Sequence, residues 1–188
     1  MLVEKLKYYH PKNEQERIDK ERIMLFLHDH PDAFERKNPF GHITSSAIIV
    51  NPPMTKVLFG YHKIYDAWGW IGGHNDGDND TLAVALRETY EETKLDNVYP
   101  YSDDIFMVDI IYVEQHQKNG EYIGDHLHLN ITYLLIAEEN QPIGFNPDEH
   151  LGVRWFDIDK VLDEVDEQRM IPVYQKAFDA IRELKEKR

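Results

Sequence analysis

Three glutamates near the middle of the chain, Glu88, Glu91 and Glu92, have a spacing that calls for a positively charged partner. On a helix these positions are i, i+3 and i+4, so the carboxylates share one face, where like charges repel. A divalent cation removes that repulsion, and hard cations such as magnesium take oxygen ligands. Arg87 precedes Glu91 by four residues and is placed to pair with it. The segment therefore reads as a metal site, with a solvated acidic helix face, which charge runs usually are, as the alternative.

The segment just before these glutamates, GGHNDGDND, reads as a loop that enters the helix. Gly72 and Gly73 permit a tight turn whose backbone carbonyls could also face an ion. The loop also carries three aspartates that could add oxygen ligands: Asp76, Asp78 and Asp80. We predict a helix from about Asp80 to Thr93. The residues expected to anchor it to a sheet form an apolar face: Ala83, Leu86 and Tyr90.

Composition limits the partners of this site. The chain has 188 residues, 41% of them hydrophobic, which suits one globular domain with a core. It has no cysteine, no apolar run of membrane-spanning length and no apolar N-terminal signal, so we expect a cytoplasmic protein without a membrane partner. A net charge of -14 repels a nucleic-acid duplex. A phosphorylated small molecule bridged to carboxylates by metal ions is compatible with this charge.

The elements that must position the site are short strands between helices. A helix is expected over residues 12–28, strands at SSAIIVN, KVLFGYH, AWGWIGG and GVRWFDI, and a linker at Pro100. Asn119-Gly120 predicts a hairpin between two longer strands. A helical turn is expected within residues 157–165, and a last helix begins at Pro172 with an amphipathic stripe: Tyr174, Ala177, Phe178, Ile181 and Leu184. The order predicts an α+β fold, a layered α/β/α domain with a mixed sheet.

The spaced motif resembles the Nudix box. That box runs from a glycine to Arg-Glu fourteen residues later, then to Glu-Glu and an aliphatic residue; the matching positions are Gly73, Arg87, Glu88, Glu91, Glu92 and Leu95. The resemblance covers roughly residues 42–161, and the GGHNDGD loop is similar to a bacterial subgroup. Two positions depart from the pattern, since Asn79 stands where the box has glutamate and Lys94 where it has glycine. We expect an N-terminal helical arm over 1–41, a Nudix hydrolase domain over 42–165 and a C-terminal helix over 166–188 packed on it.

The resemblance implies a Nudix-type pyrophosphohydrolase, which cleaves the diphosphate linkage of a nucleoside diphosphate derivative with Mg²⁺ or Mn²⁺. The residues it implies as metal ligands are the Gly72 carbonyl, Glu88, Glu91 and Glu92. Glu88 is also a candidate base, and Arg87 would orient the carboxylates. Glu149, in the NPDEH loop, is a further candidate base, with an ordinary polar loop residue as the alternative.

Substrate contacts are expected from four residues near the box: His74, Trp70, His126 and His128. Each has a simpler alternative, since His74 could be a turn residue and Trp70 could belong to the core. His126 and His128 alternate on a predicted strand, so their rings face the same side. With Asp125 they could form part of a separate metal site, but no third ligand stands at a supporting spacing.

Two other functions use the same fold. The first is a non-catalytic Nudix-fold domain that binds a nucleotide or regulates a partner, and Asn79 and Lys94 motivate it. The second is a diphosphate isomerase, which the absence of cysteine disfavours because those enzymes rely on one. We expect a nucleotide-type small molecule as the partner of this protein, and either terminal helix could form a homodimer contact.

Overall fold

The computed structural model describes residues 2–118 and 120–187, and its contacts divide into two compact units. Unit 1 consists of three segments, Met1–Ser46, Gly72–Ala85 and Asp103–Tyr133. Unit 2 consists of the alternating segments Ala47–Ile71, Leu86–Ser102 and Leu134–Arg188. Each unit is described by itself.

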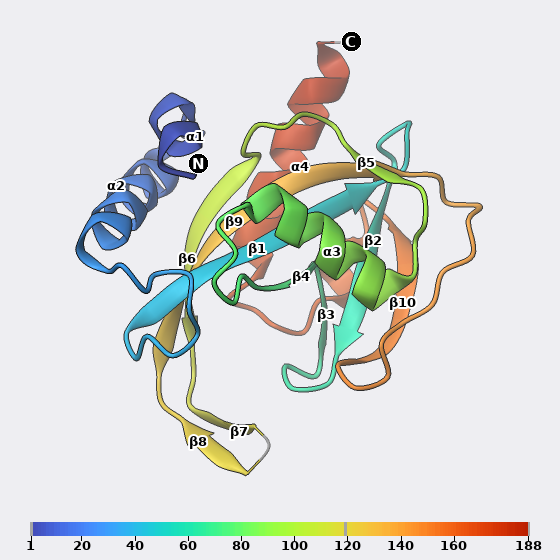
Figure 1. Ribbon diagram of the computed structural model, residues 1–188. Helices are drawn as coiled ribbons and strands as arrows, with labels where there is room; N and C mark the ends of the chain where they lie inside the picture. The colour runs from blue at the N-terminus through green and yellow to red at the C-terminus, as the bar shows by residue number, and fades with distance from the viewer. Residues whose placement is uncertain (1, 119, 188) are drawn as a thin grey trace. The chain divides into compact units, whose positions relative to one another are not determined.

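In unit 1, two helices precede the strands: α1 (Leu2–Tyr8) and α2 (Glu14–Asp29). The α2 helix begins after Asn13, whose side chain accepts a hydrogen bond from the Glu16 amide, as expected of an N-cap. It lies along β6 (Met107–Val113), where the Asp19 carboxylate accepts from the Ile110 amide at 3.0 Å (Figure 1). The predicted helix over residues 12–28 is confirmed. The sequence did not predict α1, which is shorter than an isolated helix needs to be stable.

His126 and His128 lie on β9 (His126–Ala137), which pairs antiparallel with β6. His126 lies opposite Val113, and His128 opposite Ile111. Between the two strands the chain forms a small separate ribbon of β7 (His116–Lys118) and β8 (Glu121–Ile123) (Figure 1). Gly120 takes the left-handed φ of 82° that such a turn needs. Asn119, the other residue of the predicted turn, lies outside the described residues.

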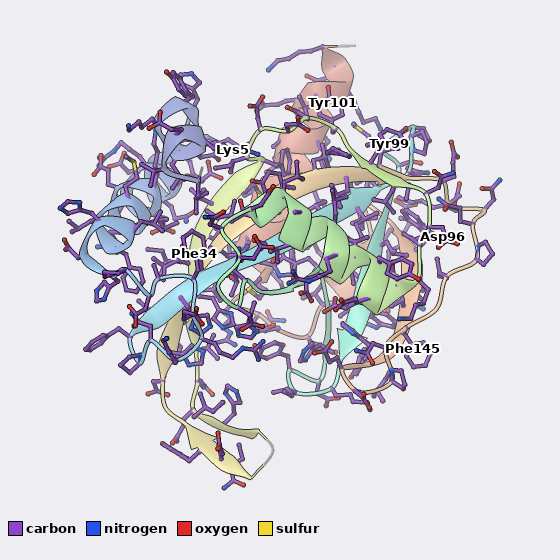
Figure 2. All side chains as sticks on the ribbon, viewed as in Figure 1. Lys5, Phe34, Asp96, Tyr99, Tyr101 and Phe145 are labelled. Atoms are coloured by element: carbon purple, nitrogen blue, oxygen red, sulfur yellow. The ribbon has the colours of Figure 1, made fainter. Side chains whose placement is uncertain are left out.

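The acidic loop follows β4 (Ile71–His74), which pairs with β1 (Gly41–Val50); residues 72–74 and 41–46 of these strands belong to unit 1. A Cβ at Gly72 would lie 2.5 Å from the Ser45 carbonyl oxygen, so only glycine permits this approach of β4 to β1. The loop is held from the N-terminal side, because the Phe34 carbonyl accepts from the Gly77 amide and Arg36 pairs with Asp76. Phe34 is labelled in Figure 2.

Unit 2 contains the ladder of β10 (His150–Asp157), β2 (Lys56–His62) and the end of β1, with β3 (Ala67–Gly69) also beside β2. These strands confirm the predicted ones. The predicted linker at Pro100 is wrong, because β5 (Val98–Pro100) pairs with the end of β9. Since β5 ends the strand order, its proline sits where the sheet tolerates a missing donor.

The C-terminal part of unit 2 has a short 3-10 helix, η1 (Val161–Glu164), and then α4 (Ile171–Glu186) with Pro172 in its first turn. Both were predicted. Tyr174 and Phe178 are buried, and the Tyr174 ring lies 4.9 Å from that of Phe59 on β2. The α4 stripe therefore packs as the amphipathic pattern indicates.

Hydrogen bonding links the strands of the main sheet in the order β10–β2–β1–β9–β5, with β3, β4 and β6 pairing beside this path. With four α-helices among the described residues, this is the predicted α+β class. No helix in the described part of the chain is both long and apolar enough to cross a membrane.

Candidate active site

The helix that carries the acidic motif, α3 (Thr81–Thr93), starts where the sequence places it. The Asp80 carboxylate accepts from the Ala83 amide at 3.1 Å and so caps the first turn. Asp78 in turn accepts from the Asp80 amide at 2.9 Å. Aspartates on both sides of exposed Asn79 thus order the helix start in the absence of the glutamate that the box normally has.

The predicted anchoring face of α3 is wrong. Ala83 is exposed, and the Tyr90 side chain is 54% exposed. The buried positions have helical spacing but mixed polarity: Thr81, Val84, Ala85, Thr89 and Glu92. Apolar periodicity misplaced the face because two of the acidic residues, Glu88 and Glu92, are themselves turned inward from solvent.

The three glutamates differ in environment. The Glu92 side chain is 5% exposed, that of Glu88 13% and that of Glu91 55%. Arg87 donates to the Glu88 carboxylate at 3.0 Å, and the Arg87 Nε lies 4.0 Å from a carboxylate oxygen of Glu91. The predicted pairing with Glu91 is therefore present, and Arg87 also binds Glu88.

Burial is the main influence on the Glu88 carboxyl. Burial raises the pKa of this carboxyl, and the nearby Glu91 and Glu149 carboxylates raise it further, whereas Arg87 lowers it. Glu149, the candidate base, is thus close enough to Glu88 to act on it electrostatically. Its side chain accepts from the Asn146 amide at 3.2 Å, and its backbone carbonyl accepts from the Lys63 amide.

A residue that the sequence did not single out, His150, lies beside the buried glutamate. Its Nε2 is 3.9 Å from an Oε of Glu92, and the ring is almost fully buried. Burial lowers the pKa of His150 to about 4, so the ring is neutral at pH 7 and the contact is not an ion pair there. Gly60 makes room for it, since a Cβ at that position would lie 2.6 Å from the ring. The only signal in the sequence was its place directly after Glu149.

These carboxylates suit the cation that the motif implies. Glu88, Glu91 and Glu92 supply oxygen donors from one helix, and magnesium and manganese prefer such donors. Lys94, the second departure from the box, has the left-handed φ of 57° predicted for the helix exit. Its Nζ donates to the Glu91 carbonyl at 2.8 Å. Gly72 belongs to unit 1, and its role as a carbonyl ligand stays a prediction.

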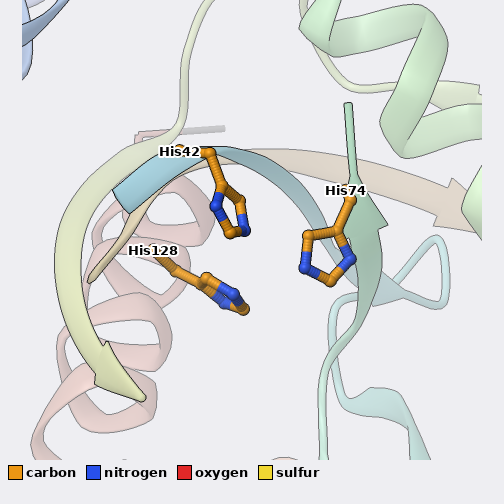
Figure 3. A group of neighbouring side chains, drawn as sticks. All are labelled: His42, His74 and His128. Atoms are coloured by element: carbon orange, nitrogen blue, oxygen red, sulfur yellow. The ribbon is translucent and has the colours of Figure 1, made fainter. Parts of the chain in front are cut away.

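The remaining predicted residues lie in two places. Trp70 is half-buried in unit 2, and its backbone amide donates to the Tyr174 hydroxyl at 3.3 Å. His74 and His128 meet in unit 1 together with His42, which the sequence analysis missed; one nitrogen from each ring lies within 4.8 Å of the other two (Figure 3). His126 lies beside His128, with ring centroids 5.1 Å apart, as its alternation on the strand predicts. No signal in the sequence connected His42 to the other rings.

Solved structures with the same fold include several hydrolases. The E. coli dihydroneopterin triphosphate pyrophosphohydrolase matches with a TM-score of 0.56 and 16% identity over 71% of this chain and 92% of that one. A C. elegans Ap4A hydrolase matches with a TM-score of 0.53 and 16% identity over 74% and 96%. A NUDIX family hydrolase from Clostridium perfringens matches with a TM-score of 0.53 and 18% identity over 74% and 97%.

No curated protein matches the chain at a significant level. The family model described as NUDIX domain does match, over residues 41–177, which is most of the chain and includes α3 with its glutamates. The chain therefore belongs to the NUDIX domain family.

Proposed function

We propose that the protein is a metal-dependent pyrophosphohydrolase that cleaves the diphosphate linkage of a nucleoside diphosphate derivative. The observation that carries the proposal is geometric: Glu88, Glu91 and Glu92 stand on one helix, the side chains of Glu88 and Glu92 are only 13% and 5% exposed, and Arg87 contacts Glu88 and Glu91. The family and the names of two structural neighbours, an Ap4A hydrolase and a pyrophosphohydrolase, agree with it.

Each residue has a defined part in the proposal. Glu88, Glu91 and Glu92, with the Gly72 carbonyl that the motif implies, would hold Mg²⁺ or Mn²⁺; a bound ion would screen phosphate oxygens and lower the pKa of water. Arg87 holds Glu88 and Glu91 in fixed rotamers through its contacts at 3.0 and 4.0 Å. Glu149 or Glu88 accepts the proton of the attacking water.

His150 has a positioning part. Its neutral ring fills the space beside Glu92 and limits the rotamers of that carboxylate without competing for it as a cation would. Trp70, His74, His126 and His128 are proposed to line the substrate site.

The test is turnover by the full chain with MgCl₂ or MnCl₂ on dinucleoside polyphosphates, nucleoside diphosphate sugars and nucleoside triphosphates. We expect metal-dependent release of a phosphorylated product, and a loss of at least about 100-fold in kcat/KM for Glu91→Gln, since even changes behind a metal ligand cost 10–100-fold. Glu183→Gln, an exposed change of equal charge on α4, is the matched control.

Absence of turnover on the whole panel, or a fully active Glu91→Gln, would contradict the proposal. Tight nucleotide binding without turnover or metal dependence would point instead to the non-catalytic binding domain. The left-handed Lys94 argues against that alternative, because the helix exit keeps its expected geometry without the glycine.

A further inference from the structure

Three imidazole rings from three strands converge in unit 1. His42 lies near the start of β1, His74 at the end of β4 and His128 near the start of β9. Their ring centroids are 4.9 Å, 5.0 Å and 5.1 Å apart, so the rings form a nearly equilateral triangle (Figure 3). One nitrogen from each ring can be chosen so that all three lie within 4.8 Å of one another.

Ring burial is hard to explain by packing alone. His42 is 3% exposed, and neither of its ring nitrogens has a hydrogen-bond partner in the described part of the chain. The same holds for Nε2 of His128. A buried polar atom without a partner costs about 1–3 kcal/mol, so such atoms are rare unless something else binds them. Here three such nitrogens lie on two rings that face each other.

We propose that His42, His74 and His128 form a three-imidazole site for a borderline divalent transition metal, zinc being the ion whose ligand preference it fits best. Imidazole nitrogen suits zinc, copper, nickel and iron, whereas magnesium takes oxygen. Three protein ligands leave a coordination position open for water or an anionic oxygen. A site of this kind therefore does not exclude a substrate contact nearby.

Small rotations of the three rings would bring their nitrogens to the spacing of a tetrahedral zinc site. Zinc binds imidazole nitrogen at about 2.0–2.1 Å, which places neighbouring ligands of a tetrahedron about 3.4 Å apart. The most distant pair of nitrogens, at up to 4.8 Å, must then close by about 1.4 Å, which rotation of the rings supplies.

Hydrogen bonds hold the strands on which the ligands stand. The Asn130 side-chain oxygen accepts from the hydroxyls of Thr44 and Ser46, each at 2.8 Å. These residues alternate with His42 and His128 on the same faces of their strands: Thr44 and Ser46 lie two and four positions after His42, and Asn130 lies two positions after His128. Next to His74, the Asn75 side-chain oxygen accepts from the Ser45 hydroxyl at 2.8 Å. Each ligand is thus placed by a buried polar contact two residues away or fewer.

The adjacent His126 is not one of the three ligands. Its ring lies 5.2 Å from that of His42, and its Nδ1 contacts the Gly124 carbonyl at 2.9 Å. This contact fixes the Nδ1 atom as the donor, so only Nε2 remains to accept. A His126 variant is therefore a control: it shows how far zinc binding changes when a neighbouring histidine that is not a ligand is removed.

This inference does not depend on the proposed hydrolase function. It uses nitrogen donors of unit 1, whereas the hydrolase proposal rests on the carboxylates of α3. Zinc binding and magnesium-dependent turnover are measured separately, so either can fail while the other holds.

The test is calorimetric titration of the chelator-treated full chain with ZnCl₂ in excess MgCl₂, which occupies the carboxylates. We expect about one zinc per chain, and a Kd at least about 100-fold weaker for His42→Gln and for His128→Gln. His126→Gln should change the Kd much less. His28→Gln, an exposed change on α2, is the matched control and should not change it. X-ray absorption of the zinc-loaded chain should show imidazole scattering, which a carboxylate-bound ion lacks.

Circular dichroism of the metal-free variants establishes that they fold. Should His42→Gln fail to fold, half-buried His74→Gln takes its place with the same expected loss. The proposal is overturned if the wild type binds no zinc, if the His74 and His128 variants bind it as tightly as the wild type, or if Glu91→Gln abolishes zinc binding.

Discussion

The carboxylate group on α3 and the histidine group of unit 1 gather ligand atoms in opposite ways. The carboxylates come from one helix within five consecutive residues, Glu88 to Glu92, and differ widely in exposure. The histidines come from three strands and share nearly equal separations. Oxygen donors on a single helix suit a hard ion, whereas buried nitrogen donors suit a borderline one. The two proposed sites would therefore suit different ions, and only the carboxylate group is visible in the sequence as a motif.

Glu92→Gln is expected to give the largest difference between the two groups. The substitution keeps the shape of the side chain but removes a buried charge, so metal-dependent kcat/KM should fall at least about 100-fold. The Kd for zinc should stay within about twofold of the wild-type value. Parallel turnover and calorimetry on one preparation measure both, and a zinc Kd that weakens together with turnover would show that the groups share one ion.

Asn130→Ala tests how rigidly the histidine group is held. It leaves the buried Thr44 and Ser46 hydroxyls without their acceptor, so the free energy of unfolding should fall by about 2–3 kcal/mol. Urea unfolding followed by circular dichroism gives the value. Exposed Asn97→Ala should change it by less than about 0.5 kcal/mol. Equal effects of the two variants would mean that the Asn130 contacts do not stabilise unit 1.

The two groups should affect the stability of the fold in opposite directions at low pH, because their pKa shifts have different consequences for proton binding. Burial lowers the pKa of His42 to about 4, below the 6.5 of an exposed ring. Between these values the unfolded chain binds more protons, so the stability that His42 contributes is present above pH 6.5 and is lost as the pH falls toward 4. Glu88 acts in the opposite sense, because its raised pKa means that the folded chain holds its proton more tightly and gains stability in acid.

Urea unfolding with a chelator at pH 7 and pH 4.5 measures this difference. We expect the loss between the two pH values to be smaller by about 1–2 kcal/mol in His42→Gln than in the wild type. His28→Gln, whose ring is exposed, should lose as much as the wild type. An unchanged loss in His42→Gln would contradict the pKa shift.

The smallest effect is expected from Lys94→Gly at the end of the carboxylate helix. Lys94 has a left-handed φ of 57°, which costs a non-glycine residue about 1 kcal/mol. Glycine should raise the free energy of unfolding by about that amount, reduced by loss of the contact with the Glu91 carbonyl. A rise in Tm of about 2–4 °C is expected by calorimetry. Lys94→Ala keeps the strain and should give no rise; a decrease for glycine would show that the lysine contact dominates.

How much the sequence could predict follows from the same contrast. The α3 glutamates, Arg87 and the Lys94 conformation were predicted because the interactions are local and the helical period relates them. The buried face of α3 was not predicted correctly, because buried carboxylates depart from the rule that apolar residues form the buried face of a helix. His42 and His150 were missed for a different reason, since their neighbours come from elements distant in the sequence: His42 meets histidines of other strands, and His150 meets Glu92 of α3. Spacing along the chain carries no information about such contacts.

The space that Gly60 leaves for the His150 ring links two positions far apart in the chain. Because a Cβ at 60 would lie 2.6 Å from that ring, a larger residue there requires a smaller one at 150. Across homologues we therefore expect these two positions to vary as a correlated pair. Because the residue at position 150 lies beside Glu92, each correlated change at positions 60 and 150 would also change the surroundings of Glu92.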